Sequence, residues 1–392
     1  MDRIQSVKRF FDNKEDWKDI LSLFCGSRVI LTIIAWFAPY FSPNGDYQRY
    51  IDQGFFLSPK WLIDIWCRWD SEWQFSITKW GYIAPEDLTA GYSNIAFFPL
   101  YPYLVRALTF WLPERFQTES VYLLVGLIFS NLFFLLGLYG LMRLGRLLYR
   151  EESVRRAVTL IFCLPCAFYF SAYYSESLFF CMIIYTLYFA EKEHWCLSAV
   201  TAALAALTRP HGVLLLLPII WIYLSKHSWD LRKIGLSWLW YLLVPAGICA
   251  YFFTLYRMTG DFFAFFKAQS SWGRSLSDTS AFAEYFQPIH SRHNRPTTID
   301  LCMIIFSLIM SVTLLIRSSA KAYGIYALAC TLVLIGTGNL YSMTRYTMVI
   351  FPIWLECADL LKNKRLYTFV CALLGTVQVL YFCGWINYYW IA

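Results

Sequence analysis

The chain has 392 residues, of which 58% are hydrophobic, 20% aromatic and only 15% charged, and its formal net charge is +7. Soluble domains carry about 25% charged residues, so the composition excludes an ordinary soluble protein. The basic residues form no dense tract, and we therefore expect membrane lipids rather than nucleic acid as the surroundings of the chain.

Apolar runs long enough to cross a bilayer recur along the whole sequence. Only helices satisfy their own backbone groups in lipid, so the pattern predicts an all-α polytopic membrane protein with about eleven transmembrane helices. The expected spans are residues 19–41, 119–143, 156–172, 176–190, 194–208, 211–225, 236–257, 299–317, 322–338, 344–361 and 366–386.

The distribution of basic residues predicts the orientation. Arginines crowd residues 143–156 and lysines and arginines crowd the N-terminus, so both segments are expected in the cytoplasm. An even number of spans must separate them, and the apolar segment 95–112 is therefore expected to be a juxtamembrane helix in the outer interface. The long loops 42–118 and 258–298 then lie outside. No repeat divides the chain, which is expected to form one domain, residues 1–392.

The densest polar cluster lies in the first outer loop, in the string WLIDIWCRWDSEWQFSITKWGY. Asp70 and Glu72 are two residues apart, so they share a face only if the backbone between them is not helical. Two carboxylates beside a lipid surface suit the deprotonation of an acceptor hydroxyl. The alternative is that Asp70 caps a helix beginning at Ser71. These residues alone leave both interpretations open.

Five motifs in this order resemble the PIG-V mannosyltransferase family, a branch of the GT-C membrane glycosyltransferases. They are RWDSEWQFSITKWGY, AFFPLYPYLVR, FYFSAYYSESLFF, ALTRPHGVLLLLP and SMTRYTMVIFP. Residues 258–298 have no counterpart in this resemblance.

The resemblance implies a GT-C-like bundle that moves a hexose, most often mannose, from a polyprenyl-phosphate carrier to a lipid-linked or surface acceptor on the non-cytoplasmic face. Asp70 matches the acidic residue associated with catalysis and would act as general base in an inverting transfer, assisted by Glu72. Arg68, Trp69 and Trp73 would line the substrate site. Asp70 and Glu72 would also be the ligands of a divalent cation, Mg²⁺ or Mn²⁺, although a flanking arginine neutralises the same phosphate without a metal.

Other charged residues in these motifs have two interpretations each. Arg209 and Arg345 would bind the donor phosphate, or else extend from a helix end to the interface. Glu176 would cap the following helix or line the acceptor cavity. His211 would relay a proton or lie at the interface. Arg28, inside the first span, would form a structural pair or belong to the site.

Two other classes of protein share this composition. A transporter or lipid flippase would place its polar residues at mid-membrane, often in repeated halves, and a non-catalytic membrane subunit would use the same fold without the chemistry. The compact loops favour the bacterial inner membrane, with the endoplasmic reticulum membrane as the alternative.

Overall fold

The computed structural model describes residues 13–391 except 42–44, 46, 86, 89–90 and 275–297. The longer helices are α2 (Lys14–Phe41), α7 (Glu119–Gly145), α8 (Glu151–Cys163), α9 (Glu176–Glu191), α10 (Trp195–Thr208), α11 (Leu216–Lys226), α12 (Leu243–Thr259), α15 (Thr298–Ile316), α16 (Lys321–Gly336), α18 (Phe351–Leu360) and α19 (Lys364–Ile386). Shorter elements include α3 (Gln48–Gln53), α4 (Trp61–Asp64), α5 (Ser71–Trp80), η1 (Asn94–Ala96), α6 (Leu100–Phe110), η3 (Ala167–Ser171), η4 (Pro210–Leu215), η6 (Leu236–Leu242), α13 (Ala264–Ser270) and α17 (Met343–Met348).

Six helical segments in the described part of the chain are long and apolar enough to cross a membrane, which identifies a multi-pass membrane protein. The expected number of eleven spans is not confirmed. The expected span 156–172 ends as a helix at Cys163 and continues as η3, and the span 344–361 is broken between α17 and α18. The prediction treated every apolar run as facing lipid, whereas several of these runs face protein.

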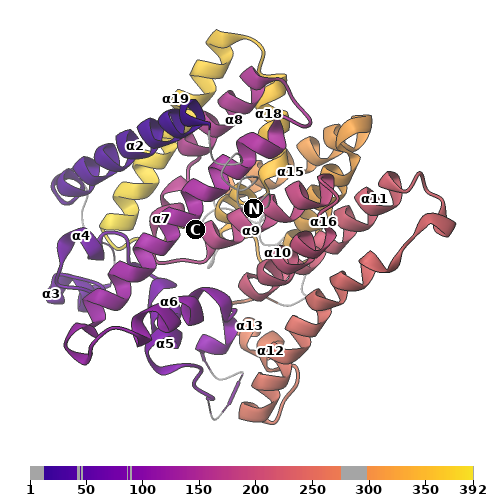
Figure 1. Cartoon of the computed structure of the whole chain (residues 1–392). Coiled ribbons are helices and arrows are strands. Elements are labelled where there is room, and N and C mark those ends of the chain that lie inside the picture. Colours follow the sequence, from indigo (N-terminus) through magenta and orange to yellow (C-terminus); the bar gives the residue numbers. More distant parts are fainter. Residues whose placement is uncertain are drawn as a thin grey trace.

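Helix α9 is the clearest case of an apolar helix buried in protein, and it lies in the middle of the bundle in Figure 1. It packs between α7 and α10. Glycines in α7 allow the close approach, because a Cβ atom at Gly137 would lie 2.7 Å from Cδ1 of Phe180 in α9. The helix therefore needs no lipid-facing stripe.

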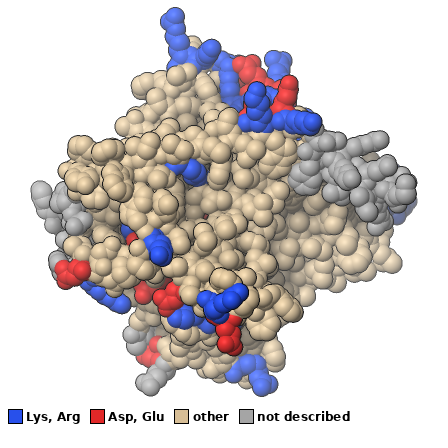
Figure 2. All heavy atoms as spheres, turned by 60° about the vertical axis from the view of Figure 1, so that its left-hand side comes forward, with Lys and Arg blue, Asp and Glu red and all other residues tan. Residues whose placement is uncertain are grey.

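Charged side chains gather at two ends of the bundle. On the face shown in Figure 2 they gather mainly toward the top and bottom, with a largely uncharged band between. The basic residues predicted that several segments lie on the same side of the membrane, and these segments contact one another at one end of the bundle. Arg146 Nη1 lies 2.5 Å from Asp16 Oδ2, and Arg156 Nη1 donates to Leu361 O at 2.9 Å. Helices α5 and α6, in the first long loop, lie toward the other end in Figure 1.

The segment expected to be juxtamembrane, residues 95–112, contains the short helix α6. Eleven residues rise about 16 Å, too little to cross a bilayer. This helix packs against α5 and α7, and the hydroxyl of Tyr101 donates to Gly126 O at 3.0 Å. It thereby fixes the last part of the first long loop against the bundle.

Candidate active site

The loop that carries Asp70 is organised by a second aspartate, Asp64. The carboxylate of Asp64 accepts backbone N–H bonds from residues 56–58 at 2.8 to 3.1 Å and pairs with the guanidinium of Arg68. The Cζ atom of Arg68 lies 4.7 Å from the centre of the Tyr388 ring, beyond the end of α19. Arg68, expected to line the substrate site, thus holds the loop together and attaches it to the C-terminal segment.

Trp69 lies between Arg68 and Asp70 with a left-handed backbone, φ +53°. Such a conformation costs roughly 1–3 kcal/mol for a bulky residue and persists only where the surroundings impose it. Here the indole packs against the rings of Tyr47 and Trp390, with centroids 4.6 and 5.3 Å away. The turn makes Asp70 the residue that precedes α5, yet its side chain forms no capping hydrogen bond, so the capping interpretation is wrong.

The Asp70 carboxylate instead faces a buried arginine from the far end of the chain. Its Oδ2 lies 2.7 Å from Nη1 of Arg345, and the two side chains are 9% and 4% exposed. The backbone N–H of Asp70 donates to the hydroxyl of Tyr174 at 3.0 Å, and that hydroxyl donates to Arg68 O at 2.9 Å. The Arg345 guanidinium lies 4.5 Å from the Tyr174 ring and 4.8 Å from the Tyr169 ring. Two tyrosines therefore fix the relative position of this ion pair.

Glu176 extends the ion pair into a four-membered cluster. Its fully buried Oε1 accepts a hydrogen bond from Nε of Arg345 and lies 3.2 Å from Nη2 of Arg209. Glu176 is the first residue of α9, and the N-cap position belongs to Ser175, so the expectation that Glu176 caps this helix is wrong. The cluster holds two carboxylates and two guanidinium groups, and this balance makes its burial tolerable.

A third aspartate supports Arg345 from the side. Oδ1 of Asp300, at the start of α15, accepts hydrogen bonds from the backbone N–H and the hydroxyl of Thr344 at 2.8 and 2.7 Å. Ser342, which precedes α17, has a left-handed backbone with φ +64°. The short helix that carries Arg345 is thus held at its beginning by a strained turn and a buried carboxylate.

The Glu72 side chain does not join this cluster and has a different hydrogen-bond partner. Its Oε2 accepts a hydrogen bond from the hydroxyl of Tyr50 at 3.4 Å, and burial together with the Glu72 charge raises the pKa of Tyr50, so this hydroxyl stays a donor. The structure therefore does not bring Asp70 and Glu72 together as a pair. Among the described residues no three His, Cys, Asp or Glu side chains gather as metal ligands. The arrangement does not fit the divalent cation considered from the sequence.

Trp73, on α5, belongs to an aromatic group that connects the two long loops. Its ring lies 6.3 Å from that of Phe97 and 5.9 Å from that of Trp272, which follows α13. The carbonyl of Trp272 accepts a hydrogen bond from Asn339 Nδ2 at 3.0 Å. The described part of the second long loop is therefore attached to the site from two directions.

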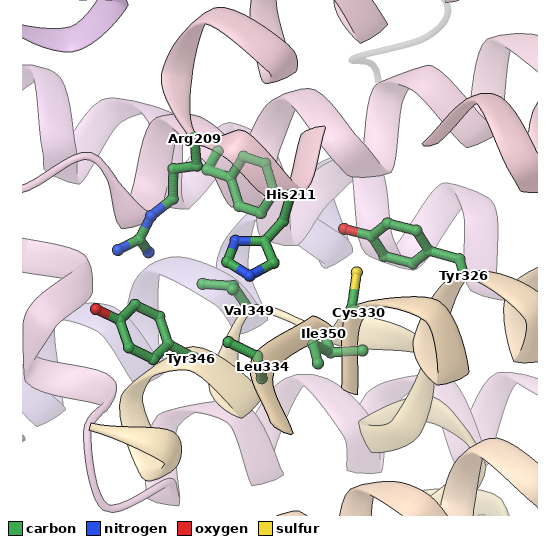
Figure 3. Close-up of a pocket in the computed structure, with 9 residues that line it drawn as sticks. Arg209, His211, Tyr326, Cys330, Leu334, Tyr346, Val349 and Ile350 are labelled. Carbon is green, nitrogen blue, oxygen red and sulfur yellow. The ribbon is translucent and has the colours of Figure 1, made fainter. Parts of the chain in front are cut away.

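Arg209 and His211 line a cavity beside the charged cluster. Figure 3 shows the Arg209 guanidinium and the Tyr346 hydroxyl at one side of it, the His211 ring in the middle, and Tyr326 and Cys330 at the other side. The lining comprises Phe179, Arg209, His211, Tyr326, Cys330, Leu334, Tyr346, Val349 and Ile350.

Some residues of this site were not singled out from the sequence. Tyr174 lies inside a recognised motif, but a tyrosine in an aromatic-rich stretch carries no distinct signal. Asp300 could have been noticed as a charged residue at the start of an apolar span, where an ion is costly unless it has partners. Arg28, by contrast, lies outside the cluster: its Nε donates to Ser171 Oγ at 2.6 Å, and its guanidinium lies 5.0 Å from the Phe24 ring.

Comparisons with known proteins identify a family and a fold. The family described as Mannosyltransferase (PIG-V) matches residues 57–268, which is more than half of the chain. The solved apo structure of the Archaeoglobus fulgidus oligosaccharyltransferase is similar with a TM-score of 0.50 and 11% identity over 95% of this chain and 56% of that one. The same enzyme tethered by a disulfide to an acceptor peptide containing the NVT sequon gives a TM-score of 0.43 and 12% identity over 93% and 55%. The chain thus spans little more than half the length of that enzyme. No curated protein matches.

Proposed function

The chain belongs to the PIG-V mannosyltransferase family and has a GT-C-like fold, and from this premise we propose that it transfers mannose from a polyprenyl phosphate to a lipid-linked or surface acceptor. We place the reaction on the non-cytoplasmic face, most simply of a bacterial inner membrane. The observation that carries the proposal is the buried cluster of Asp70, Arg345, Glu176 and Arg209. It unites four of the family-like motifs, which are far apart in the sequence.

Asp70 is the proposed general base. Its Oδ2 is held by Arg345, and its Oδ1 forms no hydrogen bond with any described residue, so one oxygen is oriented while the other is available for a proton. As the acceptor oxygen attacks the anomeric carbon, its proton moves to Oδ1. The bond from that carbon to the phosphate oxygen breaks, and the leaving phosphate keeps the electron pair. Attack opposite the leaving group inverts the anomeric centre.

The arginines take different parts in this scheme. Arg345 contacts both carboxylates through Nε and Nη1, so it would have to release Asp70 to reach a phosphate. We therefore assign Arg345 to positioning the base and keep Arg209 for the donor phosphate. Glu176 orients both arginines, and Glu72 with Trp69 and Trp73 borders the acceptor side. No step depends on a metal ion.

The decisive experiment measures mannose transfer by purified protein in lipid nanodiscs from radiolabelled polyprenyl-phosphate mannose. Asp70→Asn should lower kcat by about 10²–10⁴-fold, the usual contribution of a general base, and its melting temperature should show that the variant is still folded at the assay temperature. Asp52→Asn, in an exposed position of the same loop, is the matched control and should transfer normally. Glu72→Gln should have a much smaller effect than Asp70→Asn.

Transfer by Asp70→Asn at the wild-type rate would contradict the proposal. Wild-type protein that moves no label, from either the mannose or the equivalent glucose donor, would favour a transporter or a non-catalytic subunit instead.

A further inference from the structure

A cavity of about 230 Å³ lies between α2, α7 and α8, which pack against one another (Figure 1). Its lining comprises Asp19, Ser22 and Leu23 of α2, Met142 of α7, and Arg155, Val158 and Thr159 of α8. A water molecule needs only about 10–15 Å³ of cavity, so this one has room for a small organic group. Ser22 on its rim is exposed, and the cavity is therefore open to the surroundings of the bundle.

The cavity lies where the charged part of two helices gives way to an apolar part. Asp19 is the last charged residue of α2 before Arg28, and no charged residue follows Arg156 in α8. Both helices begin at the end of the bundle where Arg146 contacts Asp16. In a bilayer, phospholipid headgroups occupy such a boundary between charged and apolar surface. The position therefore favours a lipid headgroup as the ligand.

The polar groups of the cavity are mainly hydrogen-bond acceptors. Ser22 Oγ donates its hydrogen to Asp19 O at 2.9 Å, and Thr159 Oγ1 donates to Arg155 O at 3.2 Å. Each hydroxyl therefore presents only lone pairs to a ligand. The Asp19 carboxylate pairs with Arg155 through Oδ2, and its Oδ1 has no hydrogen bond within the described part of the chain. Two hydroxyl oxygens and one carboxylate oxygen are thus free to accept, and a primary ammonium has three N–H groups to donate.

The ion pairs around the cavity favour a cation as well. They join three carboxylates to two guanidinium groups, namely Asp16, Asp19 and Glu151 to Arg146 and Arg155. One negative charge is left over within this network. Nη2 of Arg155 lies 3.7 Å from Asp16 Oδ1, too far for a hydrogen bond, so it keeps a donor for an anionic group. A ligand with both an ammonium and a phosphate matches these features.

An apolar face of α2 continues from the cavity. Gly26, one turn beyond Ser22, has open space where a Cβ atom would lie. Val29 and Ile33, on the same face, are 58% and 52% exposed. A ligand seated in the cavity could therefore extend a hydrocarbon chain along α2, which a small soluble amine could not do.

We propose that this cavity binds the headgroup of a phospholipid with a primary ammonium, of the phosphatidylethanolamine class. The ammonium donates to Asp19, Ser22 and Thr159, and the phosphate accepts from Nη2 of Arg155. An acyl chain lies along the face of α2 that contains Gly26. The bound lipid connects α2 to α8 at the membrane surface. This site is separate from the charged cluster at Asp70 and does not depend on the proposed function.

The test measures lipid binding to the delipidated full-length protein in detergent by native mass spectrometry. Phosphatidylethanolamine should bind at least about tenfold more tightly than phosphatidylcholine or phosphatidylglycerol with the same acyl chains. The reason is that a quaternary ammonium has no N–H group and glycerol has no charge, so each loses charge-assisted hydrogen bonds. Equal affinities for the three lipids would overturn the assignment of the headgroup. Water-soluble phosphoethanolamine that binds as tightly as the lipid would overturn the assignment to a membrane lipid.

Matched variants locate the site. Asp19→Asn keeps the size of the side chain and should weaken phosphatidylethanolamine binding by about tenfold or more. Glu152→Gln is the control, because it also breaks an ion pair with an arginine of α8 but does not line the cavity. Ser22→Leu fills the cavity and should abolish the preference for phosphatidylethanolamine, whereas Cys25→Leu, at an exposed position of α2, should retain it. Melting temperatures verify that each variant is folded.

The variants also give the results that would refute the site. Wild-type binding of phosphatidylethanolamine by both Asp19→Asn and Ser22→Leu would overturn it, as would an equal loss of binding in Glu152→Gln. Asp70→Asn should bind phosphatidylethanolamine as wild type does. A loss in Asp70→Asn as large as that in Asp19→Asn would overturn the assignment to this cavity.

Discussion

Replacing Arg345 by methionine would test the buried ion cluster as a determinant of stability. The change keeps much of the side-chain volume and removes the guanidinium that contacts Asp70 and Glu176. All three side chains are at least nine-tenths buried, so water cannot replace the lost contacts. Removing one partner from such a cluster typically costs about 3–5 kcal/mol, because the remaining charge is left uncompensated.

The cost should be recovered in part when the carboxylate is neutralised as well. Asp70→Asn alone should cost about 1–3 kcal/mol, since Arg345 keeps Glu176. In the double variant the Asp70 charge that Arg345→Met leaves unpaired is absent. The loss in the free energy of unfolding should therefore be smaller in the double variant than the sum of the two single losses, by about 0.5–3 kcal/mol.

The free energy of unfolding in detergent micelles, followed by tryptophan fluorescence during chemical denaturation, measures all three variants. Arg257→Met, at an exposed position, is the control and should lie within about 0.5 kcal/mol of wild type. Arg345→Met with wild-type stability, or strictly additive losses in the double variant, would refute the reasoning.

Three further substitutions each test one of the interactions that hold the candidate site in place. Asp64→Asn weakens the acceptor of three backbone N–H groups and should lower the free energy of unfolding by about 2–4 kcal/mol in the same assay. Gly212→Ala places a Cβ atom 2.4 Å from backbone atoms of α10 and should lower both the melting temperature and mannose transfer, whereas Gly235→Ala, with open space around it, should be neutral. Thr344→Val removes the hydroxyl that donates to Asp300 and should cost about 1–2 kcal/mol while lowering kcat, and wild-type kcat would show that this hydroxyl bond is not needed to position α17.

The sequence was sufficient to predict the class of fold, and it identified the segments that form the candidate site. Apolar runs and a deficit of charge predict a helical membrane bundle from elementary solvation, and the loop around Asp70 was recognisable from its polar density. The number of spans was not predictable in the same way. Hydropathy reports how apolar a segment is, but it does not report whether lipid or protein surrounds it, and α9 is surrounded by protein.

The composition of the charged cluster could be anticipated only in part. Asp70, Glu176, Arg209 and Arg345 were singled out separately, but no local pattern shows that Arg345 contacts Asp70 across 275 residues of sequence. The D-x-E spacing suggested a pair of carboxylates that the backbone turn at Trp69 does not produce. Long-range pairing depends on the complete packing, which spacing along the chain does not encode.

The burial of α9 has a consequence for biogenesis. Its 16 residues rise about 24 Å, less than the hydrocarbon thickness of about 30 Å, and its first residue is the anionic Glu176. One of the two guanidinium groups that neutralise Glu176 is made only when the ribosome reaches Arg345, 169 residues later. Until then α9 has a charged end and little lipid-facing surface of its own, so we expect it to reach its final depth late. A chain truncated before α17 should therefore be recognised by membrane quality control as an incomplete protein.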